Sequence, residues 1–242
     1  MIFMNKVATG IAGLDAMLYG GIPEGNQVVL AGGPGAGKTL LGFNYLYNNA
    51  KAGNTSVFFA MEETPDRVID NAKEAFPDFT DIDDLIASKK LIIDGEDPST
   101  VIRSGSTNSY EFGKVVADIE STITSYKATR AVIDSLSVID LLINDPGVYR
   151  RSMISLVSNL RRLNVTSLLT SELANPDFSN QDFKPEFFIF DGVIVMYETG
   201  KEDRRMLAME VLKMRGSNHS FAITPYEITS SGFNVIAAEG SM

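Results

Sequence analysis

Short apolar runs alternate along the first two thirds of the chain with longer segments in which apolar positions recur every three or four residues. The short runs predict buried strands at 27–31, 55–60, 91–94, 131–134 and 165–170. The longer segments predict helices at 40–50, 65–76, 82–88, 110–127 and 148–163. Strands that are apolar throughout and alternate with helices are typical of a parallel sheet covered by helices on both faces.

The pattern changes after Asp191, where apolar segments are separated by turns and no helical periodicity follows. These segments predict strands at 192–196, 206–214, 221–226 and 233–236. We expect them to add antiparallel strands to one edge of the sheet. Neither an internal repeat nor a linker is visible, so we expect one domain over residues 1–242.

Between the first strand and the first helix, residues 32–39 match G-x-x-x-x-G-K-[ST], the phosphate-binding loop. Glycines let successive backbone N–H groups turn inward toward phosphate oxygens, and the helix that follows adds the positive end of its dipole. Lys38 supplies a positive charge to the outer phosphates, and Thr39 offers a hydroxyl to Mg²⁺. A glycine-rich turn that binds nothing is the alternative, but the succession of strand, loop and helix disfavours it. The predicted nucleotide contacts are Gly33, Pro34, Gly35, Ala36, Gly37, Lys38, Thr39 and Leu40.

Acidic residues end two of the predicted strands. Asp134 suits the acid that holds Mg²⁺ through a water beside the Thr39 hydroxyl. Glu62 and Glu63 follow the strand at 55–60, where a carboxylate can accept a proton from the water that attacks the γ-phosphate. Adjacent residues of a strand face opposite ways, so we assign Glu62 as the base and Glu63 as a helper. Turn formation by Asp134, and stabilisation of the next helix by the two glutamates, are the alternatives.

Other polar positions carry weaker signals. Thr170 and Ser171 end the last parallel strand, where a hydroxyl either senses the γ-phosphate or merely ends the strand. Arginines at 150–151 and 161–162 lie on one predicted helix, as a solvated face or as a subunit contact. The stretch 213–219 places Lys213 and Arg215 on one side of a strand; alone it reads as an exposed edge. His219 alone reads as a surface-loop histidine.

Composition excludes several classes of site. The 242 residues include no cysteine and one histidine, which excludes disulfides and thiolate metal sites and disfavours a histidine-based zinc site or triad. Net charge is −10, so a general duplex-binding surface is not expected. The sequence contains no run of 18 apolar residues, so no membrane-spanning helix is predicted. The N-terminus lacks a signal-peptide pattern, so we expect a cytoplasmic protein.

Taken together, the motifs resemble the KaiC-like branch of the RecA superfamily, especially its single-domain archaeal type. The resemblance covers nearly the whole chain. Besides the phosphate loop and the acids already described, it rests on these segments: 9–15 (TGIAGLD), 20–25 (GGIPEG), 62–65 (EETP), 132–136 (VIDSL), 169–172 (LTSE), 191–194 (DGVI) and 213–219 (KMRGSNH). The paired glutamates and the last stretch are the most specific of these.

The resemblance implies a RecA-like α/β P-loop fold, ATP and Mg²⁺ as ligands, and a ring, expected to be a hexamer, with nucleotide at subunit interfaces. Carried over by position, Lys213 and Arg215 reach the neighbouring subunit's nucleotide in trans, and His219 contacts the same nucleotide. The clock protein KaiC carries two such domains, whereas one is visible here. The segment 139–149 also lacks the adjacent Ser-Thr acceptor pair, which disfavours Ser/Thr autokinase activity.

Three functions follow as hypotheses. The first is a slow ATP-hydrolysing ring that acts as a regulatory or signalling nucleotide switch. The second is a recombinase-like DNA-binding ATPase, although the two loops that would contact DNA, 140–149 and 174–190, are acidic. The third is a non-catalytic module that senses ATP and binds an unidentified protein partner.

Overall fold

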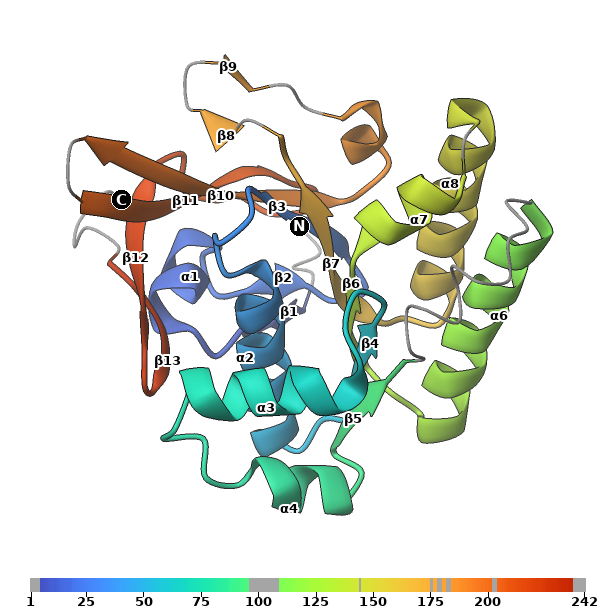
Figure 1. The fold of residues 1–242 in the computed structure, drawn as a ribbon, viewed down its shortest axis with the longest axis horizontal. Coiled ribbons are helices and arrows are strands. Elements are labelled where there is room, and N and C mark those ends of the chain that lie inside the picture. The colour runs from blue at the N-terminus through green and yellow to red at the C-terminus, as the bar shows by residue number, and fades with distance from the viewer. Residues whose placement is uncertain are drawn as a thin grey trace.

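A mixed β-sheet forms the centre of this computed structural model, which describes residues 5–95, 109–143, 145–174, 176–177, 180–181, 184–201 and 204–236. Within these residues the sheet has nine strands in the order β13-β12-β11-β10-β3-β7-β6-β4-β5 (Figure 1). Their bounds are β3 Gln27–Gly32, β4 Ser56–Ala60, β5 Leu91–Asp94, β6 Arg130–Asp134, β7 Thr166–Glu172, β10 Gly192–Lys201, β11 Arg204–Met214, β12 Thr224–Thr229 and β13 Gly232–Val235.

The strands from β10 through β3, β7, β6 and β4 to β5 pair in parallel, whereas β11, β12 and β13 add antiparallel strands beyond β10. This arrangement confirms the predicted fold class: a mostly parallel α/β sheet with antiparallel strands at the C-terminal edge. Because β3, β7, β6 and β4 are parallel neighbours, their carboxyl ends lie together along one edge. The phosphate loop leaves β3 at that same edge.

Helices cover both faces of the sheet. Their bounds are α1 Ala12–Met17, α2 Lys38–Lys51, α3 Pro65–Ala75, α4 Ile82–Ala87, α6 Ser109–Tyr126, α7 Leu136–Leu142 and α8 Pro146–Arg162. The first four pack on one face and the last three on the other (Figure 1). Alternation along β3 explains both cores, since Val28 and Leu30 face one helical layer while Val29 and Ala31 face the other.

The expected helix α3 begins as its sequence indicates. Thr64 is the N-cap and its hydroxyl accepts from the Arg67 N–H, and Pro65 occupies the first helical position. The same device starts α8, where the Asp145 carboxylate accepts from the Val148 N–H at 2.8 Å ahead of Pro146.

Two predicted boundaries were wrong. The segment expected as a loop from 139 to 149 begins inside α7, which the Ser135 hydroxyl caps by accepting from the Ser137 N–H. The strand expected at 221–226 starts only at Thr224, and Phe221 is 85% exposed. Its apolar character therefore does not reflect burial in the sheet.

Several short elements were not predicted. They are the pair β1 (Lys6–Val7) and β2 (Ile22–Pro23), the pair β8 (Pro176–Asp177) and β9 (Asn180–Gln181), and the one-turn helix η1 (Pro185–Phe188). No helix in the described part of the chain is both long enough and apolar enough to cross a bilayer.

Candidate functional site

The phosphate loop joins β3 to α2 through glycines in left-handed conformations. Gly35 and Gly37 have φ values of +83° and +84°, and Gly37 is the N-cap of α2. A Cβ added to Gly37 would lie 2.9 Å from the Ile228 side chain, so this position requires glycine for space as well as for backbone angle. The Tyr226 hydroxyl donates to the Ala36 carbonyl at 2.6 Å and ties β12 to the loop.

Lys38, the first residue of α2, is folded back over the loop. Its Nζ donates to the carbonyl oxygens of Gly33 at 2.9 Å and Gly32 at 3.1 Å. Burial lowers the pKa of Lys38, and the nearby carboxylates of Glu172, Asp134 and Glu62 raise it. The ammonium group therefore lies in an acidic surrounding, at the position where the motif places phosphate oxygens.

Thr39 and Asp134 lie side by side. The Thr39 hydroxyl donates to Asp134 Oδ2 at 2.8 Å, and the Thr170 hydroxyl donates to Oδ1 of the same carboxylate. Asp134 is buried, which raises its pKa, whereas the hydrogen bonds from the two threonines lower it. Thr170 contacts the predicted metal-binding acid directly.

Glu62 and Glu63 point to different partners. Glu62 accepts a hydrogen bond from the Ser135 hydroxyl, next to Asp134. Burial raises the pKa of Glu62, the charges of Asp134 and Glu172 add to that rise, and the Ser135 hydrogen bond opposes it. Glu63 instead accepts from the Asn71 side chain on α3 at 2.8 Å. Of the two, Glu62 has the environment that suits a general base.

These residues fit a magnesium nucleotide. Three carboxylates surround a single lysine ammonium, so a triphosphate there needs further positive charge, which a divalent cation supplies. Among the described residues, no group of three or more acidic or histidine side chains could hold a metal by itself. A cation held by Thr39 and Asp134 would take its remaining ligands from waters and phosphate oxygens.

Lys213, Arg215 and His219 lie elsewhere. Gly192 pairs with Val28 near the start of β3 and with Met214 at the end of β11, which places Lys213 and Arg215 at the opposite edge of the sheet from the phosphate loop. At about 3.3 Å per residue, the length of β3 separates the two places by about 17 Å. His219 is 9% exposed and packs against the Phe221 ring, contrary to the expected surface-loop position.

Two of the four arginines noted on the predicted helix have partners within this chain. Arg161 pairs with Asp191, and Arg162 pairs with Glu120. The site analysis of the sequence missed Ser135 and Glu172, although Ser135 directly follows one predicted strand and Glu172 lies two residues after another. Their positions at strand ends were the available signal.

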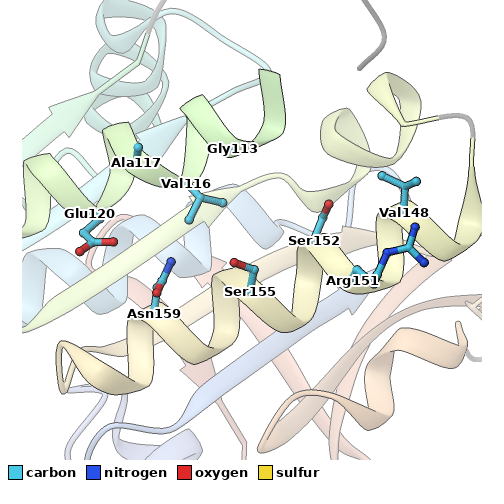
Figure 2. A pocket seen from close by; sticks show the side chains of 9 residues that line it. All are labelled: Gly113, Val116, Ala117, Glu120, Val148, Arg151, Ser152, Ser155 and Asn159. Carbon is cyan, nitrogen blue, oxygen red and sulfur yellow. The ribbon is translucent and has the colours of Figure 1, made fainter. Parts of the chain in front are cut away.

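A separate pocket of about 490 Å³ lies between α6 and α8, away from the phosphate loop (Figure 2). Its lining comes from these two helices: Gly113, Val116, Ala117, Glu120, Val148, Arg151, Ser152, Ser155 and Asn159. None of these is a predicted nucleotide contact.

Comparison with known proteins agrees with this geometry. The family model described as "ATPase: KaiC" matches residues 7–240. The circadian clock oscillator protein KaiC of Parathermosynechococcus lividus is 31% identical over 232 residues, which are 95% of this chain and 42% of that protein. KaiC of Rippkaea orientalis is 32% identical over 234 residues, covering 96% and 44%. The chain thus spans less than half of the length of these curated relatives.

Among solved structures, a KaiC-like protein from the hyperthermophilic archaeon Pyrococcus horikoshii OT3 superposes with a TM-score of 0.81 at 28% identity. The match covers 96% of this chain and 99% of that one. A phosphate loop, the buried Asp134 and the carboxylate of Glu62 at the carboxyl ends of parallel strands are thus accompanied by likeness over nearly the full length. This chain belongs to the KaiC ATPase family.

Proposed function

We propose that this protein is a single-domain, magnesium-dependent ATPase that hydrolyses ATP slowly and works as a ring, expected to be a hexamer, with nucleotide between subunits. The ring serves as a regulatory or signalling nucleotide switch. One observation carries the proposal: Lys38, Thr39, Asp134 and Glu62 converge at the carboxyl ends of neighbouring parallel strands. Ligands bind at that edge in open α/β sheets.

In this mechanism the loop amides and the N-terminus of α2 bind the phosphates, and Lys38 exchanges its two carbonyl partners for phosphate oxygens. Thr39 and Asp134 would hold Mg²⁺, which neutralises charge on the phosphates when bound. Glu62, oriented by Ser135, takes the proton of the attacking water. Glu63 contributes by fixing the start of α3 through Asn71.

Lys213 and Arg215 complete the pocket of an adjacent subunit. Their place about 17 Å from this chain's own loop, at about 3.3 Å per strand residue, is beyond the reach of a lysine or arginine side chain. A head-to-tail neighbour can receive them, and His219, four residues after Arg215, contacts the same nucleotide. The cations then stabilise charge that develops on the transferred phosphoryl group.

Glu62→Gln tests the base assignment. The substitution keeps the side chain's shape and its contact with Ser135 but removes the proton acceptor. We expect turnover to fall at least about a hundredfold, the lower range for general-base catalysis, while ATP affinity by calorimetry stays unchanged. Glu63→Gln is the matched control; hydrolysis at the normal rate in Glu62→Gln would remove Glu62 from the mechanism.

Lys213→Ala and Arg215→Ala test the trans contact. We expect each to lower turnover about a thousandfold or more if it acts as an arginine finger does, with ATP binding retained. Full activity in both variants would leave the ATP site intact and overturn the shared pocket. Size-exclusion chromatography with light scattering, with and without ATP, measures the assembly itself.

The described residues add nothing in favour of DNA binding. In the two loops considered for that role, Lys184 lies 3.7 Å from Asp140, so an acid already offsets its charge. A non-catalytic ATP sensor retains the same pocket, and the Glu62→Gln comparison separates it from an ATPase, because a sensor shows no turnover to lose. A salt-dependent gel shift on single-stranded DNA checks the remaining alternative.

A further inference from the structure

Three cationic side chains surround one carboxylate at the amino ends of the parallel strands, opposite the phosphate loop. Asp191 directly precedes β10, and 11% of its side chain is exposed. Arg161 approaches it from the last turn of α8, while Lys213 and Arg215 approach from the end of β11. We call these four residues the Asp191 cluster.

Arg161 occupies both oxygens of the carboxylate. Its Nη2 donates to Asp191 Oδ1 at 2.7 Å and its Nε donates to Oδ2 at 3.1 Å. The backbone N–H of Gln27, at the start of β3, donates to Oδ2 at 3.0 Å. Such a forked, charge-assisted pair is the strongest way an arginine can hold a carboxylate.

Arg215 is bonded to Asp191 through its backbone, whereas its guanidinium makes no hydrogen bond to the Asp191 carboxylate. Its N–H donates to the Asp191 carbonyl at 2.8 Å, which fixes the chain at this point. Its Nη1 lies 3.8 Å from Asp191 Oδ1, too far for a hydrogen bond, and its Nη2 donates to the Phe188 carbonyl at 2.9 Å. The side chain is 53% exposed, whereas that of Arg161 is 39% exposed.

Lys213 is held by carbonyls. Its Nζ donates to the Phe190 oxygen, beyond the end of η1, at 2.6 Å and to the Phe187 oxygen, within η1, at 3.4 Å. Lys213 therefore does not compete for Asp191, and Arg215 is the cation best placed to replace Arg161.

We infer that Arg161 is a positioning residue: by filling Asp191 it leaves the Arg215 guanidinium available to the neighbouring subunit's nucleotide. The inference rests on the proposed function, because it requires Arg215 to act in trans. If Arg161 is removed, a largely buried carboxylate loses its partner and draws Arg215 inward. Arg215 then reaches the neighbouring phosphate less often.

The test is steady-state ATP hydrolysis by the full chain carrying Arg161→Gln. We expect kcat to fall about tenfold, the size expected for a competing hydrogen bond to a charged group, with ATP affinity unchanged. Arg162→Gln is the matched control, since the next residue of α8 pairs with Glu120 instead. We expect that control to retain the normal rate.

A double variant separates positioning from mere structural support. Arg161→Gln with Asp191→Asn removes the carboxylate that captures Arg215, so we expect it to recover most of the lost rate. Arg161→Lys keeps a cation paired with the Asp191 carboxylate. We expect its turnover to stay within about threefold of normal, because one charged hydrogen bond survives. Thermal unfolding verifies that each variant is folded.

Normal turnover in Arg161→Gln would overturn the inference, as would a folded double variant that stays as slow as Arg161→Gln alone. If the double variant does not fold, a rate in Arg161→Lys as low as that in Arg161→Gln overturns it. Arg215→Ala distinguishes the two levels: normal turnover in that variant defeats the trans mechanism itself. Impaired Arg215→Ala with normal Arg161→Gln defeats only the role of Arg161.

Discussion

The Asp134 carboxylate lies between two threonine hydroxyls, one from α2 and one from β7. Thr39 is part of the phosphate motif, but Thr170 is on a strand that is far away in the sequence. With Thr170 fully buried, its hydroxyl fixes one oxygen of Asp134 and leaves the other beside Thr39. The Thr170 hydroxyl therefore has a specific partner, the Asp134 carboxylate, and does more than end the strand.

Thr170→Val should loosen Asp134 while keeping the volume of the side chain. We expect about a tenfold higher Mg²⁺ concentration for half-maximal turnover, since a hydrogen bond to a charged group is lost. A magnesium titration of the ATPase rate measures this. Thr166→Val, at the other end of β7, is the matched control, because the Thr166 hydroxyl accepts from the Gly25 N–H instead. An unchanged titration in Thr170→Val would contradict the assignment.

The pH dependence of turnover should report on Glu62. Only the ionised carboxylate accepts a proton, and partial burial raises the pKa of Glu62 above its ordinary value. Turnover is therefore present above the raised pKa and lost as pH falls through it. Ser135→Ala removes a hydrogen bond that lowers this pKa, so we expect the acid limb of the pH–rate profile to move to higher pH. Movement to lower pH would contradict Glu62 as the base.

At the scale of elements, the phosphate loop packs closely against neighbouring strands at the point where it joins α2. Gly37 has a left-handed backbone and faces the side chains of Ile228 and Phe233, which belong to β12 and β13. The antiparallel strands added at the C-terminal edge thus form the wall behind the loop. This contact links the nucleotide site to the part of the sheet that leads to Lys213 and Arg215.

Gly37→Ala should destabilise the protein more than Gly53→Ala. Both glycines have positive φ, at +84° and +93°, but nothing lies within 4 Å of a Cβ added to Gly53. Both variants incur backbone strain, and only Gly37→Ala adds overpacking, which typically costs about 1–3 kcal/mol. Urea unfolding measures the difference; equal losses would show that the wall behind the loop yields without cost.

Element types could be predicted where one periodicity dominated. Strands such as β3 and β6 are apolar on both faces because helices cover both, so they appear as continuous apolar runs. The short α7 was missed because its seven residues follow β6 directly and contain too few turns to show a helical period. Asp145-Pro146 repeats the helix-start signal of Thr64-Pro65. The predicted helix began at residue 148, so this signal was not used, although α8 begins at Pro146.

Part of the candidate site was predictable for the same reason. The motif placed Lys38 and Thr39, and strand ends placed Asp134 and Glu62 at a common edge. The pairing of Thr170 with Asp134 and of Ser135 with Glu62 was not predictable, because the order β3-β7-β6-β4 is set by packing and not by position in the sequence. His219 is buried beside the point where the Ser220 N–H donates to the Met17 carbonyl, a contact between distant segments that has no local sequence signal.

At the scale of the molecule, two inactive variants should complement each other. A subunit with Arg215→Ala keeps Glu62, and a subunit with Glu62→Gln keeps Arg215. Random mixing in equal amounts gives about one contact in four that combines both intact groups, so we expect about a quarter of normal turnover per subunit. Mixing before assembly, followed by an ATPase assay, measures this. No recovery in mixed assemblies of normal size would show that each pocket is complete within one chain.

The separation of the phosphate loop from Lys213 and Arg215 along β3 also has a geometric consequence. If each subunit supplies its two cations to the pocket of the next subunit, an open row of subunits always has one end pocket that receives none. Only a row whose two ends join gives each member a complete pocket. Turnover per subunit should therefore be highest in a closed ring. An open assembly that lacks one subunit should lose the activity of the one pocket beside the gap.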